Sequence, residues 1–169
     1  MHASRSDINA AREAFRDSGI TGKAALSFAL WFGAGLFPGA PGTVGTICAI
    51  PLIVLLHSLG DTWQLLGLAA TVAVAVWASE SSRRSIGELD PPLVVVDEVA
   101  GFTLTMSFLP LSWVALVLGF VLFRAFDILK PYPIRWLERA PGGVGIVLDD
   151  LGAGFCAFLV TKILLVFVF

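Results

Sequence analysis

Five apolar stretches separated by short polar or glycine- and proline-rich segments dominate the chain: 24–36, 44–59, 63–79, 99–123 and 151–169. A helix needs about 17–25 apolar residues to cross a bilayer. Stretches 63–79 and 151–169 reach this length. Stretch 44–59 falls just short of it and contains Pro51, which predicts a kink. These three stretches are therefore predicted to be membrane-spanning helices.

The other two stretches predict less regular elements. Stretch 24–36 is too short to span and runs into a segment rich in glycine and proline, which favours a re-entrant or interfacial segment. Stretch 99–123 is interrupted by Pro110 and Ser112, which predicts a hairpin extending from about 93 to 126. The expected fold is all-α: a polytopic helical membrane protein with about four spans plus a re-entrant or interfacial segment.

The first 23 residues differ from the rest because basic and acidic side chains alternate in them. They have no apolar core or cleavage site of the signal-peptide kind directly after the charges. We expect a retained amphipathic N-terminal helix. The predicted organisation is a cytoplasmic segment over 1–23 and a membrane-embedded domain over 24–169.

Composition supports a membrane protein. Of the 169 residues, 57% are hydrophobic and 14% are charged, whereas soluble domains are about 45–50% apolar and about 25% charged. A soluble monomer of this size could not bury so much apolar surface, and a disordered chain would need the opposite composition. The net charge of −2 offers no basic field for nucleic acid. Two cysteines in apolar runs support neither a disulfide framework nor a metal site.

The basic residues predict the orientation in the membrane. They cluster in the N-terminal tail, at Arg83 and Arg84, and between 124 and 139, whereas the turns near 57–62 and 109–112 have none. Because cytoplasmic loops are enriched in Lys and Arg, the N-terminus and the segments 80–92 and 127–148 are predicted to be cytoplasmic. Acids in polar turns, such as Glu80, Glu88 and Asp90, are expected in loops beside these cations.

Five other acids lie on or at the ends of apolar runs: Asp97, Glu98, Asp127, Asp149 and Asp150. Each costs about 2.5–3.5 kcal/mol to insert, so each needs protein partners or water. Carboxylates at one depth repel one another, and a divalent cation would offset that repulsion. Oxygen ligands favour Mg²⁺, Ca²⁺ or Mn²⁺ over Zn²⁺. The alternative is that the acids are neutralised in ion pairs with Arg124, Lys130 and Arg135.

Groups that could bind an anion accompany these acids. Thr43 follows a glycine- and proline-rich loop and is predicted to open a helix, whose free N–H groups favour phosphate. Lys130 and Arg135 flank the proline- and tyrosine-containing segment 131–134, which would equally suit an interfacial anchor. A Walker loop and a Gly-x-Ser-x-Gly nucleophile motif are both absent from the sequence. Metal-assisted chemistry by carboxylates remains.

With these residues the chain resembles the phosphatidylglycerophosphatase A family, whose members are lipid phosphatases of the bacterial inner membrane. Three blocks carry the resemblance: GAGLFPGAPGTVG at 33–45, VVVDEVAG at 94–101, and FRAFDILKPYPIRW at 123–136 continuing to GGVGIVLDD at 142–150. Together they cover about residues 24–160. Tyr132, Glu138 and Val147 stand where the family pattern has Trp, Asp and Met, and none of these departures removes a candidate ligand.

The resemblance implies Mg²⁺-dependent hydrolysis of phosphatidylglycerophosphate to phosphatidylglycerol and phosphate. It implies a multi-pass protein of the bacterial inner membrane whose active site faces the cytoplasm and takes its lipid from the cytoplasmic leaflet. The expected metal ligands are the five acids above, and four of them are also candidate catalytic residues together with Lys130: Asp97, Asp127, Asp149 and Asp150. Arg124, Lys130, Arg135 and Thr43 are the expected phosphate ligands. The sequence assigns no oligomeric state.

Two routes fit these residues: a carboxylate accepts a proton from an attacking water, or an aspartate attacks the phosphate directly. Among other classes, a transporter with an intramembrane carboxylate cluster would require acids at the span centres, and these acids lie at predicted span ends. A lipid phosphotransferase would carry an Asp-x2-Asp-Gly-x2-Ala-Arg motif, which the chain lacks. A purely structural membrane subunit is the remaining alternative.

Overall fold

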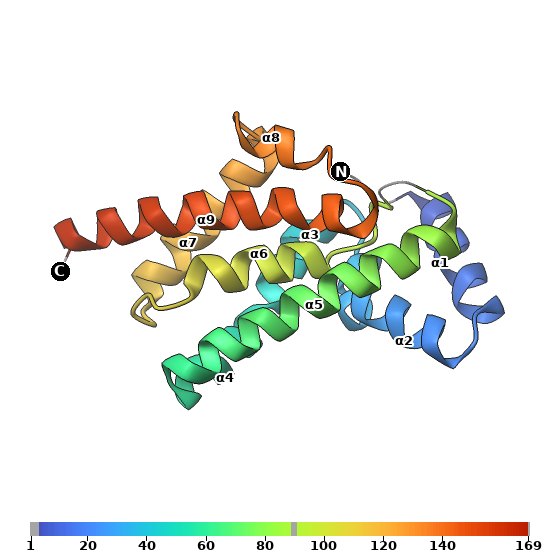
Figure 1. The fold of residues 1–169 in the computed structure, drawn as a ribbon, viewed down its shortest axis with the longest axis horizontal. Coiled ribbons are helices and arrows are strands. Elements are labelled where there is room, and N and C mark those ends of the chain that lie inside the picture. Colours follow the sequence, from blue (N-terminus) through green and yellow to red (C-terminus); the bar gives the residue numbers. More distant parts are fainter. Residues whose placement is uncertain (1–3, 89–90, 169) are drawn as a thin grey trace.

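The computed structural model describes residues 4–88 and 91–168, which form helices and turns without a β-strand (Figure 1). The predicted all-α class is confirmed for this part of the chain. The elements are α1 (Arg5–Asp17), α2 (Ile20–Ala29), the 3-10 helix η1 (Trp31–Leu36), α3 (Pro41–Cys48), α4 (Ile50–Leu59), α5 (Asp61–Ile86), α6 (Val96–Met106), α7 (Trp113–Leu129), α8 (Ile134–Leu137) and α9 (Gly142–Val168). Of the polar-turn acids named above, Asp90 lies outside the described residues.

Within the described ranges, three helical stretches are long and apolar enough to cross a membrane: Pro41–Leu59, Asp61–Ile86 and Gly142–Phe167. The first joins α3 and α4 through Ala49, close to Pro51, whose ring removes one helical hydrogen bond. The predicted hairpin is an 11-residue α6 and a 17-residue α7 joined by a turn. At 1.5 Å per residue, α6 is only about 16 Å long. The count of four full spans stays a prediction.

The segment before the first span is helical as well. α1 begins at a capping box formed by Ser4 and Asp7, and its Ala11 is buried against Leu30 and Leu93. α2 begins at Ile20, so a helix crosses the boundary that the sequence placed after residue 23. The chain then tightens into η1, where Gly33 takes a left-handed conformation that glycine tolerates without strain.

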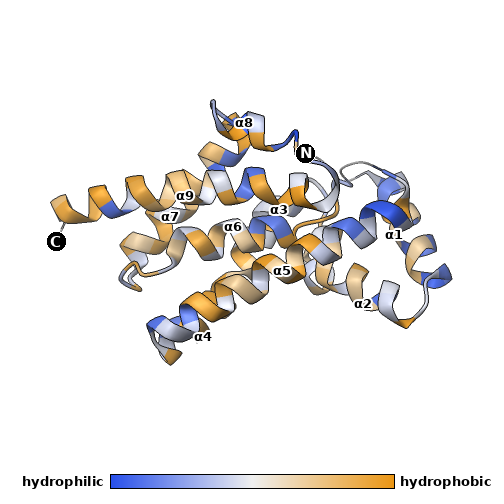
Figure 2. Cartoon of the chain, viewed as in Figure 1, coloured by the Kyte–Doolittle hydropathy of each residue, from blue (hydrophilic) through white to orange (hydrophobic). Residues whose placement is uncertain are grey.

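The central helices pack side by side. α9 lies against α5, α6 and α7, and α6 is almost enclosed by its neighbours (Figure 1). Phe102 of α6 and Phe123 of α7 are fully buried in this core. Large apolar side chains are instead exposed on α4, α7 and the C-terminal half of α9. Figure 2 shows that the C-terminal half of α9 consists mostly of hydrophobic residues. An apolar exterior around a packed helical interior is the arrangement expected in lipid.

Candidate active site

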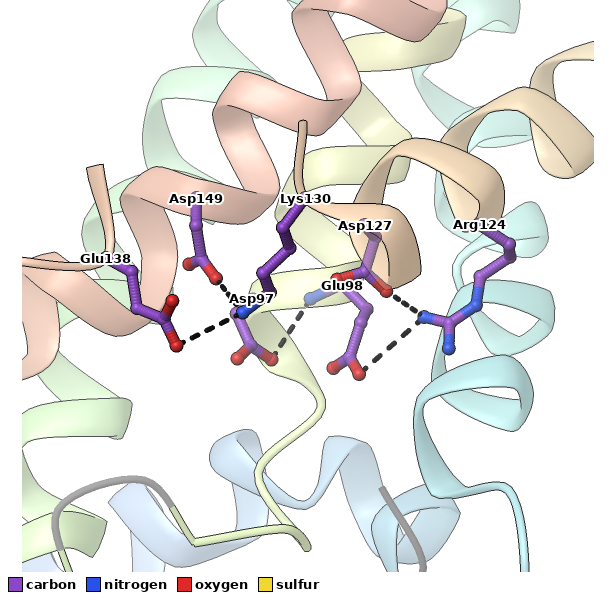
Figure 3. A network of polar contacts seen from close by, with 7 residues as sticks. All are labelled: Asp97, Glu98, Arg124, Asp127, Lys130, Glu138 and Asp149. Carbon is purple, nitrogen blue, oxygen red and sulfur yellow. Dashed lines mark hydrogen bonds and ion pairs between the residues drawn. The ribbon is translucent and has the colours of Figure 1, made fainter. Parts of the chain in front are cut away.

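A cavity of about 710 Å³ opens where the first turns of α3 and α6, the end of α7 and the beginning of α9 meet. All five acids that the sequence singled out line this cavity, together with two predicted phosphate-binding cations. They are Asp97 and Glu98 from α6, Arg124 and Asp127 from α7, Asp149 and Asp150 from α9, and Lys130 from the residue that ends α7. Figure 3 shows these side chains except that of Asp150. Residues that are up to 53 positions apart in the sequence thus line the same cavity.

Two glycines bring the acid-bearing helices together. A Cβ added to Gly154 of α9 would overlap the backbone of Gly101 of α6, and a Cβ on Gly101 would lie 2.6 Å from the carbonyl oxygen of Asp150. Thr105 holds the same crossing, because its hydroxyl donates to the carbonyls of Gly101 (3.0 Å) and Gly154 (3.2 Å). Asp97 lies one turn before Gly101, and Asp150 one turn before Gly154. Residues four apart share a helix face, so this close crossing turns the two carboxylates toward each other.

Three carboxylates form the core of the site. One oxygen from each of Asp97, Glu98 and Asp150 lies within 4.8 Å of the others. Asp97 and Asp150 are buried, and the Oε2 atom of Glu98 is buried without a hydrogen-bond partner in the described chain. Three acids this close repel one another unless a cation or protons intervene. Because all the donors are hard oxygens, the residues fit a divalent cation such as Mg²⁺.

The other two acids form ion pairs. Arg124 Nη1 lies 2.6 Å from Asp127 Oδ2 and 3.8 Å from Glu98 Oε1. Lys130 Nζ lies 2.6 Å from Asp149 Oδ2 and 3.4 Å from Glu138 Oε1. The neutralised pairs considered from the sequence therefore exist for Asp127 and Asp149. The second oxygen of Asp149, Oδ1, is buried with no described hydrogen-bond partner, so this side chain retains an acceptor.

Lys130 sits in an unusual backbone conformation. It ends α7 with φ 41° and ψ 56°, a left-handed geometry that costs a residue with a side chain about 1–2 kcal/mol. Partial burial lowers the pKa of the Lys130 ammonium, but the hydrogen bond to Asp149 and the nearby acids raise it by more, so the net pKa shift is upward. The ammonium therefore stays protonated where it borders the cavity.

The glycine-rich segment 39–43 also lines the cavity. α3 begins at Pro41, two residues before Thr43, so the prediction that Thr43 opens the helix is wrong by half a turn. Proline has a fixed φ suited to the first helical position. A Cβ on Gly42 would overlap Oε1 of Glu98, so a side chain at this position would displace the Glu98 carboxylate from its place beside Arg124.

Arg135 lies apart from the other predicted phosphate ligands. It is exposed on α8 and lines a separate, shallower depression of about 320 Å³. The proline at 131 ends α7 just before this turn, and the chain then folds outward into α8 (Figure 1). The cavity between α3, α6, α7 and α9, called the acidic cavity below, is therefore lined by three of the predicted phosphate ligands, Arg124, Lys130 and Thr43, but not by Arg135.

Sequence reasoning missed Glu80 and Arg83. The loop predicted for Glu80 is wrong, because α5 continues to Ile86 and carries both residues. Glu80 accepts from the backbone N–H of Gly143 (2.8 Å) at the start of α9 and from Arg83 and Arg84. Arg83 in turn lines the cavity. The available signal was the spacing, since Glu80 stands three and four residues before two arginines, as salt bridges on a helix require.

Replacing Glu80 by alanine should therefore lower activity, although Glu80 itself is not among the residues proposed to bind metal or phosphate. The variant loses the contact that ties α9 to α5 and the acceptor that orients Arg83. We expect a fall in catalytic activity of about 10–100-fold, as for other residues that orient a site, together with a lower unfolding temperature. Glu88→Ala removes an exposed acid shortly after the same helix and is the matched control. Wild-type turnover and stability in Glu80→Ala would show that the contacts of Glu80 do not help to position α9 or Arg83.

Comparison with known proteins identifies relatives of the chain. The family model of phosphatidylglycerophosphatase A matches residues 27–165. A phosphatidylglycerophosphatase A of Escherichia coli strain K12 is 39% identical over 130 residues, covering 75% of this chain and 74% of that protein. One of Haemophilus influenzae strain Rd is 36% identical over 135 residues, covering 78% and 83%.

A third relative carries a different name. A Bacteroides thetaiotaomicron protein named "Putative phosphatidylinositol-3-phosphatase" is 36% identical over 140 residues, covering 78% of this chain and 87% of its own length. No solved structure matches the chain. The apolar helices and these relatives define a membrane-embedded phosphatase. The chain belongs to the phosphatidylglycerophosphatase A family, so the resemblance stated from the sequence is confirmed.

Proposed function

We propose that the protein hydrolyses phosphatidylglycerophosphate to phosphatidylglycerol and phosphate, and that the reaction depends on Mg²⁺. The observation that supports this most strongly is the juxtaposition of three carboxylates with two cations in one cavity. Carboxylates suit a divalent cation, and cations suit a phosphate. Two relatives of the chain are named for this activity.

Asp97, Glu98 and Asp150 are the proposed primary metal ligands because their oxygens already converge. Asp127 is proposed as a further ligand through the oxygen that Arg124 does not hold. Asp149, whose Oδ2 is held by Lys130, has only Oδ1 left and is proposed as the base rather than as a ligand. Bound Mg²⁺ would neutralise charge on the phosphate and acidify nearby water. The protein's own contribution is to keep five acids at fixed positions, largely shielded from bulk solvent.

Arg124 and Lys130 are proposed to bind the phosphate oxygens as charged hydrogen-bond donors, with Thr43 lining the same cavity. We propose Asp149 as the general base because its Oδ1 is a buried acceptor while Lys130 fixes its Oδ2. Water then attacks phosphorus, its proton passes to Asp149, and the bond between phosphorus and the glycerol oxygen breaks. The glycerol oxygen takes up a proton from solvent and leaves as the alcohol, and Asp149 releases its proton to solvent.

The proposed location is the bacterial inner membrane, with the cavity at the cytoplasmic face. Support comes from the charges: Arg83, Arg124 and Lys130 all border the cavity, and cytoplasmic ends of membrane helices are enriched in such residues. The phosphate of a lipid in the cytoplasmic leaflet would lie at that level.

The test is phosphate release from phosphatidylglycerophosphate by the detergent-purified protein. We expect release in Mg²⁺, a fall of at least about 100-fold in excess EDTA, and recovery when Mg²⁺ is restored. Release that EDTA does not affect would contradict the metal assignment. If folded protein released no phosphate under any of these conditions, ion flux in liposomes would test the transporter alternative.

A further inference from the structure

A basic and aromatic depression lies on α8, outside the acidic cavity. It has a volume of about 320 Å³ and is lined by Lys130, Tyr132, Arg135, Trp136 and Arg139. Tyr132 and Trp136 are 87% and 61% exposed. The neighbouring end of α7 also exposes apolar side chains, with Ile128 and Leu129 at 69% and 76%. Aromatic residues beside exposed apolar ones are typical of the headgroup level of a bilayer.

The charge of this depression is not balanced. Arg135 and Arg139 form no ion pair with any acid in the described ranges, 4–88 and 91–168. The acid next to them in sequence, Glu138, lies 3.4 Å from Lys130 instead. Two unpaired guanidinium groups over one hollow form a site for an anion, because guanidinium binds phosphate oxygens with paired, charged hydrogen bonds.

The depression adjoins the acidic cavity through a shared residue. Lys130 lines both, and its ammonium points into the acidic cavity toward Asp149 (Figure 3). The substrate under the proposed function carries two phosphates: a terminal phosphomonoester, and a phosphodiester that joins the glycerol bridge to the acylated end. With the monoester beside Lys130 in the cavity, the diester would lie on the side that leads to α8 and the apolar surface.

We propose that the α8 depression binds an anionic lipid phosphodiester through Arg135 and Arg139. The phosphodiester could be that of the substrate itself, and in that case the inference rests on the proposed function. The same chemistry could instead come from a neighbouring anionic lipid. In the first case the site sets the affinity for lipids that carry both a diester and a monoester. In the second it makes the enzyme responsive to the surrounding membrane.

The test uses the double variant Arg135→Gln/Arg139→Gln in micelles of a detergent that contains no phosphate group. Arg5→Gln/Arg12→Gln, two exposed arginines on α1, gives the same change of charge and is the matched control. If the diester belongs to the substrate, KM for phosphatidylglycerophosphate rises about tenfold or more. In this case kcat stays within about twofold, because the reacting phosphate is held elsewhere, and phosphatidylglycerol inhibits the variant less than the wild type.

If the diester belongs to a separate lipid, the variant equals the wild type in micelles without phosphatidylglycerol. Added phosphatidylglycerol then stimulates the wild type and not the variant. A second readout needs no turnover: native mass spectrometry should show phosphatidylglycerol bound to the wild type and to the α1 control, with fewer adducts on the double variant. Unchanged KM, unchanged response to phosphatidylglycerol and unchanged adducts would overturn the proposal.

The two hypotheses fail separately. Wild-type protein that hydrolyses phosphatidylglycerophosphate while the double variant matches it in every measurement would refute the α8 site alone. Wild-type protein that fails to hydrolyse the lipid, yet binds phosphatidylglycerol through these arginines, would refute the proposed function and leave the α8 site standing.

Discussion

Replacing Asp150 by asparagine is expected to reduce phosphatase activity by about 10³-fold, or ~4 kcal/mol of transition-state stabilisation. Asp150 is buried among the acids of the cavity, and one of its oxygens belongs to the three-carboxylate cluster. Asparagine keeps the shape but removes the charge that a divalent cation needs. Steady-state phosphate release in saturating Mg²⁺ measures the effect.

The same variant should be more stable than the wild type when metal is absent. Without a cation, Asp150 faces Asp97 and Glu98, and neutralising one of three close acids relieves their repulsion. Each ~1 kcal/mol gained raises the unfolding temperature by about 2–4 °C in a chain of this size. The wild type should gain stability when Mg²⁺ is added, because ligands that bind the folded state stabilise it, and the variant should not.

Glu13→Gln, which removes an exposed acid from α1, is the control for both measurements. It should leave activity and the response to Mg²⁺ unchanged. Substantial activity in Asp150→Asn, or a Mg²⁺-induced rise in its unfolding temperature equal to that of the wild type, would remove Asp150 from the metal site.

Replacing Gly154 by alanine is expected to lower activity sharply while leaving every acid in place. The added methyl would overlap the backbone of Gly101, which cannot move aside as a flexible side chain can. Overpacking of this kind costs roughly 1–3 kcal/mol. Separation of α6 from α9 would also draw Asp97 away from Asp150, so affinity for Mg²⁺ should fall together with turnover. Thermal unfolding with and without Mg²⁺, combined with phosphate release, measures both effects.

Gly152→Ala in the same helix is the matched control, because its methyl would come too close to the terminal Cδ1 atom of Leu137, which can rotate away, and would lie at ordinary contact distance from Ile134. This variant should retain most of its activity. If Gly154→Ala behaved like Gly152→Ala, the close crossing of α6 and α9 would not be what positions the cluster.

Much of the site was predictable because charges are costly at membrane depth. Asp127 and the two acidic pairs at 97–98 and 149–150 interrupt apolar runs, and such side chains must find partners inside the protein. All five do line one cavity. Arg124 and Asp127 were predictable as an ion pair for a local reason, since residues three apart on a helix are neighbours.

The misplaced residues have local explanations too. Glu80 reads as a loop residue because the apolar run ends at 79, yet α5 continues for two further turns, supported by salt bridges rather than by apolar burial. Arg135 was predicted to be part of the site because it is close to Lys130 in the sequence. The turn between α7 and α8 directs it to a different hollow.

The sequence by itself therefore determined the helical membrane character, the family, and which acids require partners, because these follow from apolar length, motif identity and the cost of burying charge. Only the tertiary structure decided the partners that lie far apart in the sequence. Lys130 pairs with Asp149 across 19 positions and Glu80 with the Gly143 N–H across 63, and the α6 and α9 acids converge. Such contacts depend on how closely two helices approach, and here backbone contact at Gly101 and Gly154 sets that distance.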